Sequence, residues 1–369
     1  MRIGIMLRHI QEKGGIVTYS HNLLKGFFRQ KSGHHFALLY ASPDMLGTYA
    51  SSPGVSEHVI PRSSKFVWDH WSVPRFADKL ELDLIFNPKL SVPLWARQKR
   101  VLVLRPEQFV HPELFPWTDR RYFKFFIPKY CKVSARVIAP AEISTRDIIN
   151  HVGVEPAKVV TVHEGCGDHF FTATPSAPAE ARVREKYNLP PDYVLFVGGL
   201  TPLKNFERLI QAYAKVQARH GIPLVVVGFN RWRFEKDLSF VSHHPASQHI
   251  LFPGFVDDQD LPYVYRMATV LFFPSIYEGF GIPIPEAFAT GCPVVTTTRG
   301  ACPEVAGGAA VLVDPFDVDD MARGLESVVS SASVQEELRA KGLARAPYFG
   351  YDRVASQTLE VLEQAMNGI

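Results

Sequence analysis

The chain has 369 residues, of which 46% are hydrophobic and 21% are charged. So much apolar material excludes an intrinsically disordered protein, and the length exceeds the roughly 250–300 residues at which a single hydrophobic core stops growing. We therefore expect two domains. The 40 Lys and Arg residues nearly balance the 37 Asp and Glu residues, which excludes a nucleic-acid binder that works through overall charge.

The N-terminus and the cysteines indicate a reducing compartment. The four cysteines show none of the close spacing of a disulfide framework or a zinc site. Arg2 and Arg8 interrupt the first apolar run, so no secretory signal is predicted. No apolar run reaches the roughly 18 residues of a membrane span. We expect a cytoplasmic protein whose membrane contact is at most peripheral.

Short runs rich in β-branched residues alternate with longer segments of helical periodicity. The expected strands are 2–7, 36–41, 83–87, 101–104, 136–139 and 159–162, then 194–197, 224–227, 270–273, 294–297 and 310–313. Their continuous apolar composition is typical of strands buried on both faces of a parallel sheet. The alternation predicts an α/β protein with two doubly wound, Rossmann-like domains facing across a cleft, and ligands beyond the carboxyl ends of the strands.

Composition also sets the expected domain boundaries. Residues 173–191 are rich in proline and small residues, which predicts a linker between an N-terminal domain (1–172) and a C-terminal domain (192–350). A helix is expected over 205–218, with Asn205 as its cap.

The segment after the strand 270–273 is the most informative. Glu278 is followed by a glycine-rich loop, Gly279-Phe280-Gly281, and then by a proline-marked helix entrance with Glu286 in its first turn. Such carboxylates can accept hydrogen bonds from sugar hydroxyls, while loop amides and the positive helix end face an anion. The alternative is a Glu286 that only opposes the helix dipole and a solvated Glu278.

This segment, EGFGIPIPE, resembles the signature of the family 4 retaining glycosyltransferases of the GT-B fold. Similar phrases follow the family's order: GGIVTYSHNLL near the N-terminus, FVGGLTPLKN at the start of the second domain, and TTRGACPEVAGGAAVLVDP after the signature. The resemblance covers nearly the whole chain. It implies an acceptor-side N-terminal domain, a donor-binding C-terminal domain, and a last helix (about 352–369) that packs back on the first domain.

The resemblance also implies roles for single residues. Glu286 would hold the ribose hydroxyls of a nucleotide-sugar, and Glu278 would lie beside the donor sugar and phosphate. Lys204 would neutralise the diphosphate, so that Glu278 and Lys204 are the expected catalytic residues. The other donor-binding positions implied are Gly14, Gly15, Gly199, Asn205, Phe255, Val256, Gly279, Phe280, Gly281 and Ile282.

Two positions depart from the family pattern. Gly199 stands where the family often has an arginine, which leaves Lys204 as the main cation for the diphosphate, with Arg231 as a candidate helper. Leu104-Arg105 stands where the family often has His-Asp, so Arg105 and Glu107 become candidate contacts to the donor or the acceptor.

The function implied is transfer of a hexose of mannose or glucose type, with retention, from a nucleotide-diphosphate sugar to a saccharide or lipid-linked saccharide in surface polysaccharide synthesis. No cofactor and no metal is expected, because the Asp-x-Asp pairs at 258–260 and 317–319 precede helical segments and are interpreted as helix caps. Two alternatives remain open here: a GT-B nucleotide-sugar epimerase, and a non-catalytic homologue that binds nucleotide-sugars.

Residues 120–136 interleave basic and aromatic side chains. One interpretation is a peripheral contact with an anionic membrane. The other, which we favour, is an amphipathic helix with Phe123, Ile127, Tyr130 and Cys131 in its apolar stripe.

Overall fold

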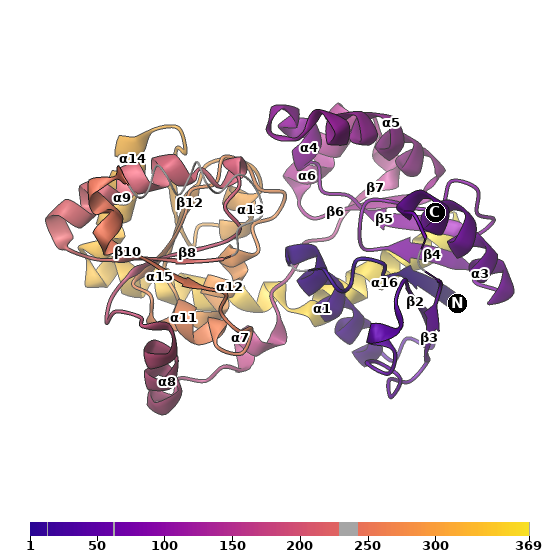
Figure 1. Cartoon of the computed structure of the whole chain (residues 1–369), viewed down its shortest axis with the longest axis horizontal. Helices are drawn as coiled ribbons and strands as arrows, with labels where there is room; N and C mark the ends of the chain where they lie inside the picture. Colours follow the sequence, from indigo (N-terminus) through magenta and orange to yellow (C-terminus); the bar gives the residue numbers. More distant parts are fainter. Residues whose placement is uncertain (13, 62, 229–242, 369) are drawn as a thin grey trace. The chain divides into compact units, whose positions relative to one another are not determined.

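A computed structural model describes residues 1–12, 14–61, 63–228 and 243–368. The chain divides into two compact units: the N-terminal unit comprises Met1–Gly165 and Tyr351–Ile369, and the C-terminal unit comprises Cys166–Gly350 (Figure 1). The segment predicted as a linker, 173–191, contains a helix, α8 (Ala177–Tyr187). Its prolines misled the prediction, because proline is well tolerated in the first turn of a helix, and here the Ser176 hydroxyl caps that turn.

The N-terminal unit is built on a seven-stranded sheet with the order β3-β2-β1-β4-β5-β6-β7, paired in parallel throughout. Its strands are β1 (Arg2–Met6), β2 (His35–Tyr40), β3 (Val55–Val59), β4 (Leu84–Asn87), β5 (Lys99–Val103), β6 (Arg136–Ala139) and β7 (Val159–Thr161). The order reverses between β1 and β4, which is therefore the switch point of this sheet.

The C-terminal unit has a six-stranded parallel sheet with the order β10-β9-β8-β11-β12-β13. Its strands are β8 (Val194–Val197), β9 (Leu224–Val227), β10 (Ile250–Gly254), β11 (Val270–Phe273), β12 (Val294–Thr297) and β13 (Val311–Val313). Here the order reverses between β8 and β11. The predicted fold class, two doubly wound α/β sheets, is confirmed.

Helices connect the strands in both units. In the N-terminal unit they are α1 (Gly15–Arg29), η1 (Pro43–Met45), α2 (Lys65–Val67), η2 (Trp68–Ser72), α3 (Val73–Lys79), α4 (Glu107–Val110), η3 (Pro112–Leu114), α5 (Trp117–Val133), α6 (Glu142–Asp147), η4 (Ile148–Val152), η5 (Pro156–Lys158) and α16 (Tyr351–Asn367). In the C-terminal unit they are α7 (Asp168–Thr172), α8, η6 (Pro202–Lys204), α9 (Phe206–His220), η7 (Pro245–His249), α11 (Leu261–Met267), α12 (Pro283–Thr290), α13 (Cys302–Ala306), α14 (Val318–Val329), α15 (Ala332–Arg345) and η8 (Ala346–Phe349).

The last helix, α16, packs against α1 within the N-terminal unit, and the two helices lie side by side in Figure 1. Tyr351, Val354 and Leu362 join the same core cluster as Tyr19 and the strands β1, β2 and β4. This helix therefore completes the core of the N-terminal unit although it is the last segment of the chain.

Helix α5 packs as the favoured interpretation of residues 120–136 predicts. Ile127, Tyr130 and Cys131 are buried and Phe123 is partly buried against the same cluster, whereas Phe125 is 58% exposed. In the part of the chain that the structure describes, no helix is both long and apolar enough to cross a bilayer.

Candidate functional site

Two charged side chains meet at the switch point of the C-terminal sheet. Lys204 ends η6 in the loop that follows β8, and Glu278 lies in the loop that follows β11. Because β8 and β11 are neighbours, the carboxyl ends of both strands open at the same place, where doubly wound sheets bind ligands. The Lys204 Nζ and Glu278 Oε1 atoms are 2.6 Å apart, and the side chains are only 18% and 14% exposed. Interpreting either residue as freely solvated is therefore wrong.

The backbone around this ion pair is tightly held. The Ile276 amide donates to the Leu203 carbonyl at 2.8 Å, which joins the two loops, and the Ala301 amide donates to the Glu278 carbonyl at 2.9 Å. Gly300 has φ +57°, and a Cβ there would lie 2.7 Å from the Glu278 backbone nitrogen and oxygen. Only glycine fits this position, so the position of Glu278 is fixed from both sides.

Asn205 occupies the N-cap position of α9, but the predicted capping bond is absent. Its backbone is left-handed, with φ 58° and ψ 34°, whereas a capping residue has extended angles. Its amide instead donates to the carbonyls of Pro274 at 3.1 Å and Pro315 at 2.6 Å. Asn205, the residue next to Lys204, thus links the end of η6 to the loop that leads to Glu278.

Glu286 lies in the first turn of α12, as predicted, and the helix ends at Gly291 in a left-handed conformation. Its side chain is buried, and the Tyr265 hydroxyl donates to its Oε2 at 2.7 Å. Burial raises the pKa of Glu286 to about 8, although the Tyr265 hydrogen bond acts in the opposite direction. A role limited to the helix dipole does not account for a carboxyl group kept in such an environment.

The loop between the two glutamates is compact. Gly279, Phe280 and Gly281 are buried, and Ile282 is partly exposed at the start of α12. The Phe280 ring packs on Phe349, with ring centroids 6.0 Å apart. Amides at the entrance of a helix held in this way suit an anionic ligand.

The other residues predicted for the C-terminal unit differ in their exposure. Gly199 is partly exposed after β8, Phe255 is 52% exposed after β10, and Val256 is buried beside it. Arg231 lies outside the described residues.

In the N-terminal unit, Gly14 and Gly15 form the exposed start of α1, where Gly14 is the N-cap with φ 128°. Arg105 forms a buried ion pair with Glu164, and its guanidinium carbon lies 4.9 Å from the centre of the Tyr19 ring. In this structure Arg105 therefore stabilises the core of its own unit. Glu107 lies in the first turn of α4.

Two family models match the chain. The model for "Glycosyltransferase Family 4" matches residues 13–167, and the model for "Glycosyl transferases group 1" matches residues 179–345. Between them they account for both units. The chain belongs to the family 4 glycosyltransferases. The family resemblance of the EGFGIPIPE segment is thereby confirmed.

Individual relatives agree with this membership. The Escherichia coli protein "O-antigen chain mannosyltransferase B" is 32% identical over 255 residues, which are 68% of this chain and 66% of that protein. The E. coli "serotype-specific mannosyltransferase WbdA" is 27% identical over 250 residues, which are 66% of this chain but only 30% of the relative. Anabaena HepE, solved in complex with UDP and glucose, has a TM-score of 0.78 at 18% identity, covering 99% of this chain and 100% of that one. This family 4 chain has the GT-B fold.

Sequence reasoning missed two features of this glycosyltransferase. From the sequence, Tyr265 looks like an ordinary core residue of a short helix. Its hydrogen bond to Glu286 depends on the fold. A second polar group, around Lys65, Asp69 and Lys89, lies in the N-terminal unit. Its one sequence signal was the position of Lys89 just after a predicted strand.

Proposed function

We propose that this family 4 protein is a retaining hexosyltransferase. It transfers a mannose- or glucose-type sugar from a nucleotide-diphosphate sugar to a saccharide or lipid-linked saccharide during surface polysaccharide synthesis. The observation that carries the proposal is the Lys204–Glu278 pair at the switch point of the C-terminal sheet, followed eight positions later by the buried Glu286. The name of the E. coli O-antigen mannosyltransferase favours mannose as the sugar.

In the proposed complex each group has one task. Glu286 accepts hydrogen bonds from the ribose hydroxyls, and Lys204 faces the diphosphate. The amides of Phe280, Gly281 and Ile282 at the entrance of α12 contact sugar hydroxyls or phosphate. Glu278 orients the Lys204 ammonium group before the donor arrives and then lies beside the sugar.

The proposed reaction takes place on one face of the sugar. The acceptor hydroxyl oxygen bonds to the anomeric carbon while the bond from that carbon to the diphosphate oxygen breaks on the same face. The proton of the acceptor hydroxyl passes to the departing phosphate. Lys204 stabilises the negative charge that develops on the leaving group, the kind of electrostatic contribution that usually dominates such catalysis. No covalent sugar–enzyme intermediate is formed.

A first test identifies the donor. In a thermal-shift screen of nucleotides and nucleotide-sugars, a donor should raise the melting temperature as a function of its concentration, because a ligand that binds only the folded state stabilises it. The absence of any shift across guanosine, uridine and adenosine diphosphate sugars would contradict the proposal.

We expect the transfer to need no metal ion. Of the two Asp-x-Asp pairs, Asp317 caps α14, as predicted, by accepting from the amides of Asp319 and Asp320. Asp260 does not cap α11, contrary to prediction, because its carboxylate pairs with Arg182 and Lys186 at 2.7 Å each. Both carboxylates already have partners. Activity after treatment with a chelator should therefore equal untreated activity, and a loss that manganese restores would refute the expectation.

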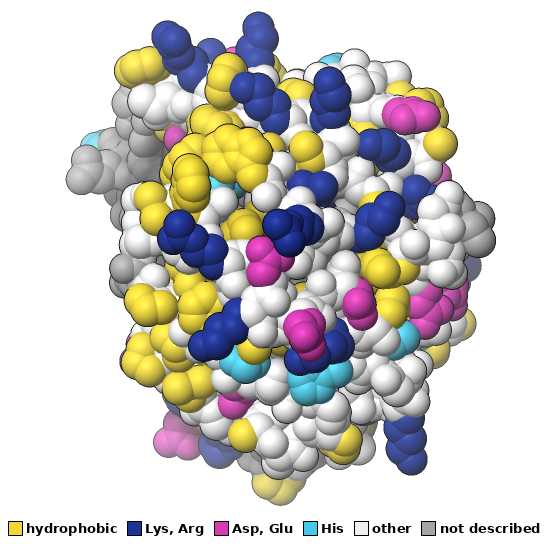
Figure 2. Space-filling view, turned by 90° about the vertical axis from the view of Figure 1, so that its right-hand side faces the viewer, with side chains coloured by type: hydrophobic (Ala, Val, Ile, Leu, Met, Phe, Trp, Pro, Cys, Tyr) yellow, Lys and Arg dark blue, Asp and Glu magenta, His cyan; other side chains and the backbone are white. Residues whose placement is uncertain are grey.

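We also propose a peripheral contact with the cytoplasmic face of an anionic membrane, made by the exposed side of α5 and its neighbours while the buried stripe of α5 packs on its own unit. Phe66, Trp71, Trp95 and Phe125 are 43%, 51%, 61% and 58% exposed, and the ring centroids of Trp71 and Trp95 are 5.8 Å apart. The basic side chains of α5 that are exposed are Arg120, Arg121, Lys124, Lys129 and Lys132. We call these residues together the aromatic–basic surface; hydrophobic and basic side chains lie beside one another in the upper part of Figure 2.

Tryptophan favours the membrane interface, and each lysine or arginine near an anionic surface contributes on the order of 1 kcal/mol. The protein should therefore sediment with phosphatidylglycerol-containing vesicles, more weakly at high salt, and much less with phosphatidylcholine alone. Replacing Trp71 and Trp95 together by serine should lower vesicle binding several-fold. Leu343→Ser, which removes an apolar side chain 46% exposed on α15, is the control. Equal sedimentation of both variants would contradict membrane docking.

A further inference from the structure

The N-terminal unit has a polar cavity of about 90 Å³ at its own switch point. Its walls include Met6 and Arg8, at and after the end of β1, and Asn87 and Lys89, at and after the end of β4. These two strands are neighbours, and the strand order reverses between them. A crevice at this place is where a doubly wound sheet binds its ligand. The site is distinct from the Lys204–Glu278 pair, which belongs to the other unit.

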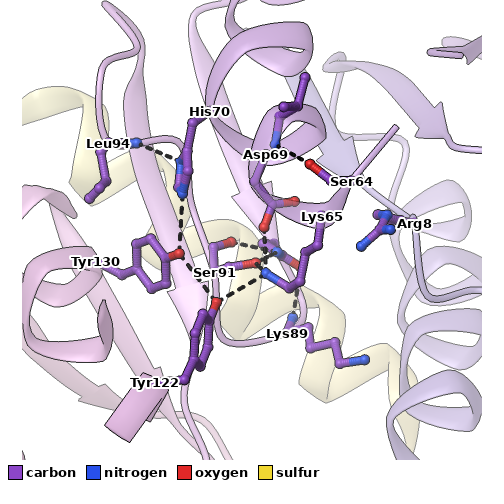
Figure 3. A network of polar contacts seen from close by, with 12 residues as sticks. Arg8, Ser64, Lys65, Asp69, His70, Lys89, Ser91, Leu94, Tyr122 and Tyr130 are labelled. Atoms are coloured by element: carbon purple, nitrogen blue, oxygen red, sulfur yellow. Dashed lines mark hydrogen bonds and ion pairs between the residues drawn. The ribbon is translucent and has the colours of Figure 1, made fainter. Parts of the chain in front are cut away.

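One of the cations in the wall, Lys65, already has hydrogen-bond partners within the protein. Lys65 donates to Asp69 at 2.5 Å, to the Ser91 hydroxyl at 3.1 Å and to the Tyr122 hydroxyl at 3.2 Å (Figure 3). An ammonium group has three donors, so these three bonds satisfy it. Lys65 also neutralises the buried Asp69 carboxylate. The two residues therefore form a floor of the cavity that carries no net charge.

The other two cations, Arg8 and Lys89, have only weak interactions within the protein. Among the residues that the structure describes, Arg8 makes a single long hydrogen bond, from Nη2 to the Ser63 carbonyl at 3.4 Å, and its Nε is buried with no partner. Lys89 pairs with Glu12 at 3.0 Å, but the Glu12 side chain is 58% exposed. A pair with one exposed partner contributes little, so Lys89 can leave it at small cost. In Figure 3 the Arg8 and Lys89 side chains lie beside the Lys65–Asp69 pair.

The charges on the wall favour an anion over a neutral sugar. Three cations, Arg8, Lys65 and Lys89, stand against two carboxylates, Glu12 and Asp69. His9 adds no charge, since burial, Lys89 and Arg105 lower its pKa to about 3. The aromatic residue in the wall, Trp68, is fully buried and its indole nitrogen donates to the Ile60 carbonyl, so its ring is held in the core.

We propose that this cavity binds a phosphate group carried by the acceptor, so that the acceptor is a phosphate-bearing saccharide. The inference rests on the proposed transferase function for its meaning, but its binding step can be measured separately. Arg8 and Lys89 hold the phosphate, and the Lys65–Asp69 pair shapes the floor. The phosphate comes either from a sugar phosphomonoester or from the diphosphate of a lipid-linked saccharide.

The test measures binding to the full chain by calorimetry, with three probes: methyl mannoside, methyl mannoside 6-phosphate, and a short prenyl diphosphate-linked saccharide. At least one phosphorylated probe should bind at least tenfold more tightly than the neutral one, and the one that does so identifies the source of the phosphate. Arg8→Gln and Lys89→Gln should each weaken that binding about tenfold or more, because each removes a charge-assisted hydrogen bond.

Two further variants serve as controls. Lys99→Gln removes an exposed lysine at the opposite end of the same sheet, where β5 begins, and should leave binding unchanged. Lys204→Met should also leave it unchanged, because the donor site lies in the other unit. Equal affinity for all three probes, or binding lost in Lys204→Met but kept in Arg8→Gln and Lys89→Gln, would overturn the inference. Nucleotide-sugar binding in the thermal-shift screen should be normal in both cavity variants, so failure of the cavity and failure of the donor site give different results.

Discussion

Lys204→Met is expected to lower kcat/KM for sugar transfer by about 10²–10³-fold, the size of effect seen when one preorganised stabiliser of a developing negative charge is removed. Methionine keeps the length and the apolar stem of the side chain but removes the ammonium group, whose Nζ atom lies 4.6 Å from the centre of the Phe273 ring. The change therefore removes the charge and little of the packing. Steady-state rates at several donor concentrations would separate a loss in kcat from a loss in donor binding.

The substitution also leaves Glu278 without its partner, so a second variant is needed. The double variant Lys204→Met/Glu278→Gln removes both charges of the pair. Lys204→Met should melt at the same temperature as this double variant; a lower melting temperature in Lys204→Met alone would show that the unpaired carboxylate destabilises the fold. Lys215→Met, which removes a 48% exposed lysine from α9 in the same unit, should retain full activity. Activity of Lys204→Met within a factor of three of the parent would contradict the assigned role.

Above about pH 8, where Glu286 is ionised, Glu286→Gln is expected to raise the dissociation constant for the nucleotide-sugar about 10–100-fold, the range for losing a hydrogen bond to a charged acceptor. Glutamine has the same size and one amide oxygen that can still accept from Tyr265. The loss should be seen in binding and in KM more than in kcat, because the ribose lies away from the reacting carbon. Glu336→Gln, at a side chain 77% exposed on α15, is the matched control and should bind the donor normally.

Glu286→Gln should also change how the free energy of unfolding depends on pH. The pKa of Glu286 is raised from its ordinary value of 4.5 to about 8. A carboxyl group whose pKa is raised by folding contributes stability that is complete below pH 4.5 and is lost as the pH rises through about 8. The free energy of unfolding, measured with urea, should therefore fall more between pH 5 and pH 9 in the parent than in Glu286→Gln. Parallel losses in the two proteins would show that Glu286 is ionised in the free protein.

Eleven of the thirteen strands that the structure describes could be predicted from sequence. Each predicted strand is present, with ends that differ by at most two residues. The two that were missed, β3 and β10, each form one edge of a sheet, whereas the opposite edges, β7 and β13, were predicted. All five residues of β3 are only partly buried, and β10 includes Pro253. An edge strand does not need a continuous apolar run, and β3 and β10 lack the run that made β7 and β13 predictable.

The residues of the proposed donor site were only partly predictable. Glu278 and Glu286 follow from the motif EGFGIPIPE and Lys204 from FVGGLTPLKN, since short-range spacing and family resemblance are visible in a sequence. That Lys204 and Glu278, 74 positions apart, touch depends on β8 and β11 being neighbours. Asn205 was assigned to the right place with the wrong bond, because its left-handed backbone was not encoded by composition. The Arg8–Lys89 cavity needs β1 beside β4, which only the sheet order reveals.

The configuration of the transferred sugar tests the central claim most directly. The full chain would be incubated with the nucleotide-sugar identified by thermal shift and a phosphate-bearing saccharide, and the product linkage assigned by NMR from its anomeric coupling constants. An α-linked donor should give an α-linked product, formed together with the nucleoside diphosphate and only when acceptor is present. A β-linked product, or donor consumption that does not depend on the acceptor, would contradict a retaining glycosyltransferase.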